Sequence, residues 1–245
     1  MTAKRRKKSV GARLRPFGWL IVPIAIALGF AAYGAATWPG FFPKRIVVSG
    51  NHIVPSSLIV RRADITTHDN VWLQNLRAAA SRVESIPYIK SAAIHRTPPA
   101  VVRIAVVERT PFAVVVSKGV RAVVDRDLRV LQTGTGGSGL PVIAVRSRVP
   151  AAGAFLRDAQ AQRLRDDDIL LTRAGIAARA LRFDRFGDLI ATTRGGTELL
   201  LGDDADLAKK TPLVDPIISQ VRAEGRKVAA VDLRAPHTPV VVYKR

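Results

Sequence analysis

The feature that most constrains this chain is an apolar run near its N-terminus. No residue from Phe17 to Phe42 is charged. As a helix, the stretch from Phe17 to Trp38 would span ~33 Å, which exceeds the ~30 Å hydrocarbon core of a bilayer. The sequence therefore predicts a transmembrane helix at residues 17–38 and a linker at 39–44, and it contains no second apolar run of spanning length.

Basic residues predict the direction in which this helix inserts. Seven of them, with no acidic residue, lie in the tail 1–16: Lys4, Arg5, Arg6, Lys7, Lys8, Arg13 and Arg15. Only Lys44 and Arg45 follow the helix closely, so the asymmetry predicts a cytoplasmic N-terminus and extracytoplasmic domains. Trp19 and Trp38 suit the two membrane interfaces as anchors.

Two other interpretations of this N-terminus stay open. A cleaved signal peptide needs small residues at its cleavage site, which Gly34, Ala35 and Ala36 offer, but its apolar core usually has only about 7 to 15 residues. The basic tail could also be a nucleic-acid arm. A basic run directly before an apolar span is ordinarily a topology signal, so we expect no nucleic acid as a partner.

Composition narrows the class of protein further. Outside the tail, 32 basic residues face 19 acidic ones, an excess that favours an anionic membrane surface, an acidic polymer or nucleic acid. The chain has no cysteine, which excludes disulfides and thiolate metal sites. With 245 residues, of which 48% are hydrophobic, it can supply an anchor and one or two small domains.

After the linker, the hydrophobic pattern predicts a first module in the order β-α-α-β-β. The second helix places Leu73, Leu76 and Val83 on one face, together with Ala79 or Ala80. Pro87 ends that helix, and β-branched residues dominate the last strand. The expected elements are a strand at 45–50, helices at 55–63 and 71–83, and strands at 88–95 and 101–107.

The remainder of the chain, residues 113–245, predicts a second module in which short strands dominate. Turns such as Lys118-Gly119 and Gly195-Gly196 separate strand-length apolar runs. Helices are expected at 159–174 and 203–224, where Pro212 and Pro216 imply a kink or a late start. The predicted fold class is therefore α+β: an N-terminal helix, the β-α-α-β-β module, and a mixed, mostly antiparallel β domain with flanking helices.

Candidate phosphate and metal motifs are weak. Gly134, Gly136 and Gly139 satisfy G-x-G-x-x-G, but a strand rather than a helix is expected after them, which favours a loose loop. The acidic run 166–168 has arginines beside it, so an exposed helix face is expected rather than a metal site. Asp125 and Asp127 fit the tip of a hairpin.

No arrangement typical of catalysis is present in the sequence. Four histidines, namely His52, His68, His95 and His237, are scattered without the i, i+4 partner of a helical zinc site. There is no G-x-S-x-G elbow and no Walker-type loop. We therefore predict no catalytic residue, no cofactor and no metal, and expect that the protein is not an enzyme.

The C-terminal segment suggests a docking edge. Asp232 and Arg234 would share one strand face and form an ion pair. A final strand at the margin of a sheet has unpaired backbone groups and can accept a strand from a partner. Pro236, Pro239 and the terminal basic pair are typical devices that protect such an edge from indiscriminate pairing.

Several short runs, together with the tail and anchor, resemble the FtsQ/DivIB family of bacterial division proteins. The combination is more specific than any single run, because strand-Gly-Asn and Glu-Arg-x-Pro recur in other polypeptide-transport-associated (POTRA) domains. The runs are Ile46-Val47-Val48-Ser49-Gly50-Asn51, Ile86-Pro87-Tyr88-Ile89, Glu108-Arg109-Thr110-Pro111-Phe112-Ala113, Leu200-Leu201-Gly202, the helix bearing Lys209 and Lys210, and Val231-Asp232-Leu233-Arg234.

The resemblance implies a non-enzymatic scaffold in the bacterial inner membrane at the division septum. It implies a POTRA domain at 45–112 and an FtsQ-type β domain at 113–245, which meet FtsB/FtsL-like single-pass partners and other divisome proteins. In the family the FtsB-like partner adds a strand to the last sheet edge, which here comprises Arg234, Ala235, Pro236, His237, Thr238, Val240, Val242 and Tyr243.

Two residues of this chain differ from those expected in the family. Ala235 stands where a larger side chain is expected, and Leu128 replaces a glycine common in the Asp-containing hairpin. Strand addition relies on backbone groups and tolerates such changes. The alternative function is that of a POTRA-containing envelope chaperone or secretion component, which shares the first module.

Overall fold

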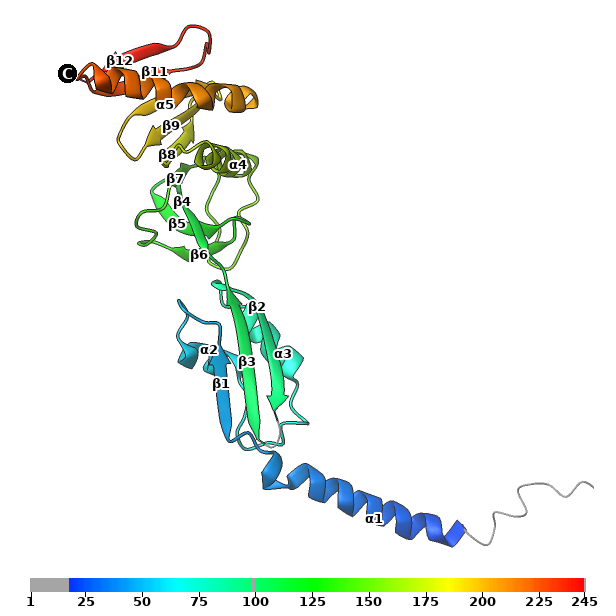
Figure 1. The fold of residues 1–245 in the computed structure, drawn as a ribbon. Helices are drawn as coiled ribbons and strands as arrows, with labels where there is room; N and C mark the ends of the chain where they lie inside the picture. Colours follow the sequence, from blue (N-terminus) through cyan, green and yellow to red (C-terminus); the bar gives the residue numbers. More distant parts are fainter. Residues whose placement is uncertain (1–17, 98–99, 245) are drawn as a thin grey trace, which may run out of the picture. The chain divides into compact units, whose positions relative to one another are not determined.

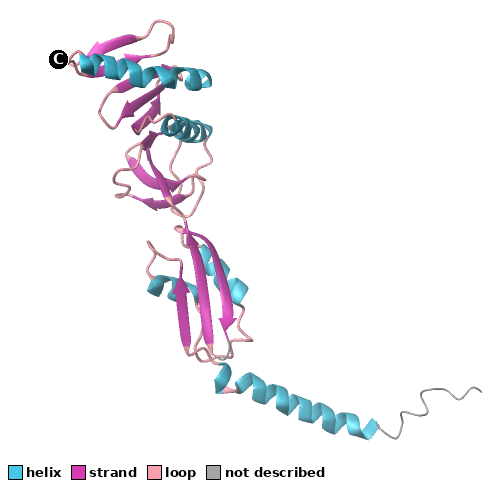
Figure 2. Ribbon diagram, viewed as in Figure 1, coloured by secondary structure: helices cyan, strands magenta, loops and turns pink. Residues whose placement is uncertain are grey.

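A computed structural model of the chain describes residues 18–97 and 100–244 (Figures 1 and 2). The seven basic residues predicted to set topology, and Phe17, lie outside the described residues. Contacts divide the chain into two compact units. The first comprises Met1–Asn51, Pro55–Val83 and Ala92–Val106, and the second comprises His52–Val54, Glu84–Ser91 and Val107–Arg245.

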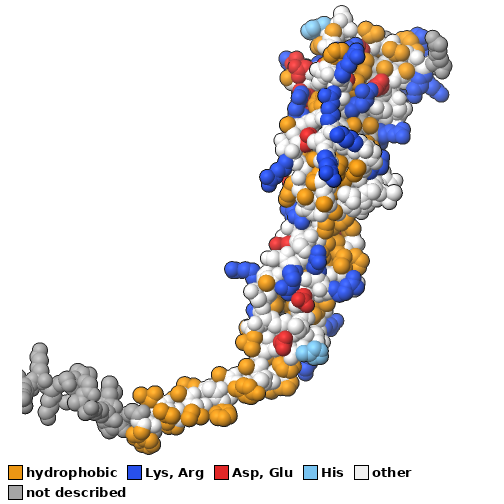
Figure 3. Space-filling view, turned by 180° about the vertical axis from the view of Figure 1, so that it is seen from behind, with side chains coloured by type: hydrophobic (Ala, Val, Ile, Leu, Met, Phe, Trp, Pro, Cys, Tyr) orange, Lys and Arg blue, Asp and Glu red, His pale blue; other side chains and the backbone are white. Residues whose placement is uncertain are grey.

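The N-terminal helix α1 (Gly18–Thr37) contains no charged residue. Its large apolar side chains are exposed, including Trp19 at 72% and Phe30 at 75%, and hydrophobic side chains follow the helix on the face drawn in Figure 3. Asn70 Nδ2 donates to the carbonyl groups of Ala35 (3.0 Å) and Ala36 (3.1 Å), which satisfies two acceptors at the helix end. Trp38, also exposed, packs edge-on against Phe41.

When only the described residues are counted, no helix reaches the combined length and hydropathy that a membrane span requires.

The first module has the predicted β-α-α-β-β order. Its strands β1 (Arg45–Ser49), β3 (Val101–Glu108) and β2 (Ile89–Thr97) form a three-stranded sheet in that spatial order. β1 runs parallel to β3, with Arg45 opposite Val101. The two helices between β1 and β2 are α2 (Ser56–Ala63) and α3 (Leu76–Glu84).

Helix α3 begins later than the sequence pattern predicted. Leu76, Ala79 and Val83 are buried as expected, but Leu73 is 72% exposed. The reason is local: Asn75 Oδ1 accepts a hydrogen bond from the Ala78 N–H (3.0 Å), so its side chain caps the first turn of a helix that starts after it.

The second unit is built on a nine-stranded sheet with the order β12-β11-β10-β9-β8-β7-β4-β5-β6 (Figure 1). Neighbours pair antiparallel except β4–β7, β7–β8 and β10–β11, which are parallel. The strands are β4 (Pro111–Ser117), β5 (Val120–Asp125), β6 (Val130–Thr133), β7 (Val142–Ala144), β8 (Ala178–Phe183), β9 (Leu189–Thr193), β10 (Glu198–Gly202), β11 (Val228–Asp232) and β12 (Val240–Tyr243).

Two helices pack on this sheet, α4 (Ala159–Arg173) on β7 and β8, and α5 (Leu207–Ala223) on β11. The main core lies between them and the sheet, where Leu164, Leu181 and Leu199 are fully buried. Helix α5 starts at Leu207, later than the predicted residue 203, and its two prolines do not break it. A 3₁₀ turn (η4, Asp204–Asp206) precedes the helix, and both prolines lie inside it.

Candidate protein-binding edge

The last strand lies at one margin of the nine-stranded sheet. β12 pairs with β11, and within the described residues no strand lies on its other side. The predicted edge residues Val240, Val242 and Tyr243 belong to this strand. Unpaired backbone groups along such a margin are the groups that an incoming strand would use.

Side chains of β12 alternate between the core and solvent. Val241 and Tyr243 pack against the main core, whereas Val240 and Val242 are 58% and 50% exposed. Val240 stands opposite Asp232 of β11, which stands opposite Leu200 of β10. The margin therefore offers backbone groups together with two exposed valines.

The other predicted edge residues form the turn that leads into β12. Arg234 pairs with Asp232 at 2.6 Å, as the sequence predicted, and its hydrogen bond holds the pKa of the Asp232 carboxyl below the ordinary value. The Thr238 N–H donates to the Ala235 carbonyl (3.1 Å) and closes the turn. Arg234, Ala235, His237 and Thr238 are exposed, and Pro236 is half-buried.

The end of β10 positions this turn. The Leu233 N–H donates to the Leu200 carbonyl (2.8 Å), and Leu233 itself is fully buried. Gly202 has a φ of +69°, and a Cβ there would lie 3.0 Å from Arg234 Cγ. The left-handed backbone conformation favours glycine, and a Cβ at this position would also push the Arg234 side chain aside.

A buried lysine supports the same corner. Lys210 Nζ donates to the carbonyl groups of Leu201 (2.5 Å) and Asp203 (3.0 Å), so two backbone dipoles compensate its charge. The family-like runs around Gly202, Lys210 and Asp232 thus meet at the end of β10. Sequence reasoning named these runs but did not predict their contact.

Glu108 has a structural role that the sequence did not reveal. Its carboxylate accepts hydrogen bonds from the N–H groups of His52 (2.9 Å), Ile53 (2.8 Å) and Val54 (2.7 Å). Burial alone would raise the pKa of Glu108, but these N–H groups outweigh it and hold the pKa below its ordinary value. Partners more than 50 residues away gave no local signal.

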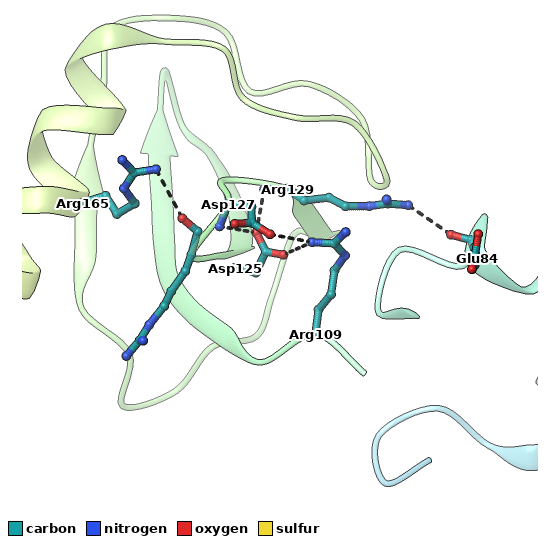
Figure 4. A network of polar contacts seen from close by, with 7 residues as sticks. Glu84, Arg109, Asp125, Asp127, Arg129 and Arg165 are labelled. Atoms are coloured by element: carbon teal, nitrogen blue, oxygen red, sulfur yellow. Dashed lines mark hydrogen bonds and ion pairs between the residues drawn. The ribbon is translucent and has the colours of Figure 1, made fainter. Parts of the chain in front are cut away.

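The next residue, Arg109, forms a buried ion pair with the hairpin between β5 and β6 (Figure 4). Its Nη1 lies 2.5 Å from Asp125 Oδ2 and 3.2 Å from Asp127 Oδ2. Asp125 Oδ1 also accepts from the N–H groups of Asp127 and Arg129, which fixes the predicted hairpin tip. Leu128, buried in the core, has a φ of +60°, the region that favours glycine.

The acidic run on α4 is not the exposed face that was predicted. Asp166 is exposed and pairs with Arg165 (2.9 Å), but Asp167 and Asp168 are only 4% and 5% exposed. Burial raises the pKa of Asp167 to about 7 and that of Asp168 to about 6. Consecutive residues cannot all face solvent on a helix that is packed on one side, and among the described residues no group of three His, Asp or Glu could hold a metal.

The comparisons with known proteins agree with this architecture. Residues 41–109 match the FtsQ-type POTRA domain family. The first module is therefore a POTRA domain of the FtsQ type. Over 235 residues the chain is 24% identical to the cell division protein FtsQ of Xanthomonas campestris pv. campestris. The alignment covers 92% of this chain and 79% of that relative.

Together, the two matches support the FtsQ/DivIB family, and the resemblance drawn from the sequence is confirmed. The chain is thus similar to a cell division protein FtsQ along most of its length, and its residues 41–109 match the FtsQ-type POTRA domain.

Proposed function

We propose that this protein is a non-enzymatic scaffold of the bacterial division septum that holds FtsB/FtsL-like single-pass proteins by strand addition at β12. The observation that carries the proposal is the margin itself. β12 has a strand partner on one side only among the described residues, and Val240 and Val242 are exposed beside it. Strand addition gives affinity through the main chain and specificity through alternate side chains.

The proposal includes an inner-membrane anchor at residues 17–38 with a cytoplasmic tail at 1–16. Apolar side chains are exposed around α1, and seven basic residues precede it in the sequence. Beyond a linker at 39–44, a POTRA domain at 45–112 and an FtsQ-type β domain at 113–245 would stand outside the cytoplasm. A single-pass anchor suits a protein that meets single-pass partners in the same membrane.

Two charge variants at β12 and one matched control at β6 test the edge. Val242→Lys and Val240→Lys place a charge on exposed positions of β12, and Thr133→Lys places the same charge on an exposed position of β6 at the opposite margin. Full-length proteins are purified in detergent together with co-expressed FtsB- and FtsL-like proteins from the same organism. Thermal melting shows whether each variant is folded.

We expect both β12 variants to lose the co-purified partners while Thr133→Lys retains them. Val242→Pro, which removes a backbone donor, should behave like Val242→Lys if the main chain carries binding. Partner yields at the wild-type level in folded β12 variants would refute strand addition at this edge.

The septal role has its own test in cells. A fluorescent fusion should gather at midcell, and depletion of the protein should produce undivided filaments. Normal division after depletion, with the fusion spread evenly, would contradict the division role whatever the edge variants do.

A further inference from the structure

A cavity of 680 Å³ lies in the second unit beside the glycine-rich loop that joins β6 to β7. Three arginines line it: Arg121 of β5, Arg179 of β8, and Arg194, which follows β9. No acidic residue is among its lining residues. Lys and Arg side chains also outnumber acidic ones over the second unit on the face drawn in Figure 3.

The three arginines are exposed and have no acidic partner within the described part of the chain. Elsewhere in the same unit, arginines are paired: Arg163 with Asp204 and Arg182 with Glu198. The cavity therefore concentrates positive charge that the protein itself does not neutralise. Guanidinium groups bind oxyanions through paired N–H donors.

The loop supplies a second set of donors. Across residues 100–244, the backbone N–H groups of Gly136, Gly137, Ser138 and Gly139 donate to no other residue. The loop is nevertheless held in place, because Gln132 Nε2 donates to the Thr135 carbonyl at 2.6 Å. Successive free N–H groups in a turn form a concave site for an anion.

Glycine is needed for the loop to lie this close to the sheet. At Gly137 the φ is +71°, and a Cβ would lie 2.5 Å from Val114 Cγ2. The Gly134, Gly136 and Gly139 motif is followed by strand β7, so the helix N-terminus of a dinucleotide site is missing, as predicted. What the motif provides instead is a row of free amides beside three arginines.

We propose that this cavity binds a phosphate-bearing ligand, either a soluble phosphate compound or the head group of an anionic lipid. A phosphate group has several acceptor oxygens and carries up to two charges, so it suits a cavity lined by several guanidinium and amide donors better than a single carboxylate does. Leu140, Val142 and Ala178 give the same cavity apolar walls for the carbon part of the ligand. The proposal does not depend on the division role.

The test uses the full chain in a neutral detergent with ¹⁵N-labelled glycine. Inorganic pyrophosphate is titrated at constant ionic strength, with citrate as the carboxylate comparison. We expect saturable shifts of the Gly136, Gly137 and Gly139 amide signals, while Gly187 in the β8–β9 turn stays unchanged.

Charge-neutral variants complete the test. Arg179→Gln and Arg194→Gln should each weaken pyrophosphate binding about tenfold, the size expected for one charge-assisted hydrogen bond. Arg157→Gln is the matched control, because Arg157 is exposed, lies outside the cavity and has no ion pair with a described residue. Absent shifts, unchanged affinity in both cavity variants, or citrate binding as tight as pyrophosphate would overturn the proposal.

Short-chain lipids distinguish the two sources of phosphate. Dihexanoyl phosphatidylglycerol that shifts the same glycine signals, with no effect of dihexanoyl phosphatidylcholine, would identify a lipid head group. Shifts with pyrophosphate alone would identify a soluble ligand. Failure of both ligands to shift these signals would refute the site and leave the β12 edge unaffected.

Discussion

The two margins of the nine-stranded sheet differ in what covers them. At the β6 margin the chain covers itself: the Val130 N–H donates to the Ala154 carbonyl (2.9 Å), and the Gly153 N–H donates to the Val130 carbonyl (2.7 Å). At the β12 margin no described strand takes that place. Because an uncovered edge invites pairing, strand addition is open along β12, whereas the start of β6 is already paired within the chain.

The ion pairs at the two margins differ in the same way. Arg109–Asp125 near β6 is buried, whereas Asp232–Arg234 near β12 is exposed on the arginine side. A buried pair that loses one partner leaves an uncompensated charge, and an exposed pair contributes little. Loss of the ion pair near β6 should therefore lower the free energy of unfolding more than loss of the ion pair near β12.

The largest effect is expected at the buried pair. Arg109→Ala should lower the free energy of unfolding by about 3–5 kcal/mol, because it leaves Asp125 buried without its counter-charge. Urea unfolding of the full chain measures this loss, with Arg157→Ala as the exposed control. A loss no larger than that of the control would remove the proposed difference between the margins.

A pH-dependent effect is expected in the middle of the sheet, where α4 packs. The pKa of Asp167 is about 7 in the folded state against an ordinary 3.8, so its contribution is most favourable below pH 3.8 and is lost as pH rises through 7. Between pH 5 and pH 8 this group alone should cost about 2–3 kcal/mol. Asp167→Asn should flatten that slope, and melting temperatures across this range check it.

An intermediate effect is expected at Leu128 of the β6 margin. Leu128→Gly relieves a positive φ, worth about 1 kcal/mol, but loses a fully buried side chain, worth about 3 kcal/mol. We expect a net loss of about 2 kcal/mol in urea unfolding. A stabilised variant would mean that backbone strain outweighs packing at this turn.

The smallest effect is expected at the exposed pair of the β12 margin. Arg234→Ala should change the free energy of unfolding by less than about 1 kcal/mol. Urea unfolding measured beside Arg109→Ala gives the contrast directly. Equal losses at the two arginines would show that exposure is a poor guide to the difference between these margins.

Local patterns predicted most of the fold. The β-α-α-β-β order follows from the spacing of the hydrophobic residues and from Gly50 and Pro87, which end a strand and a helix. The hairpin tip follows from the turn at Asp125. The start of α3 was misplaced because Leu73 continues the helical period, although the cap at Asn75 excludes it. The burial of Asp167 was missed because an arginine-flanked acidic run is typical of a solvated face.

Long-range partners could not be predicted in the same way. Glu108 binds backbone groups more than 50 residues earlier, and Gly202 meets Arg234 through strands that are distant in the sequence. Such contacts depend on topology, which periodicity does not specify. The margin position of the last strand was expected, whereas the pairing of Val130, at the start of β6, with Gly153 and Ala154 was not.

The two adjacent lysines of α5 have opposite surroundings, and chemistry at their amines should differ accordingly. Lys209 reaches solvent beside Asp206, whereas Lys210 is 3% exposed and bonded to two carbonyl oxygens. An amine-directed acylating reagent would therefore modify the first and spare the second while the domain is folded. Reaction at the second would report that the corner beneath the β12 turn has opened.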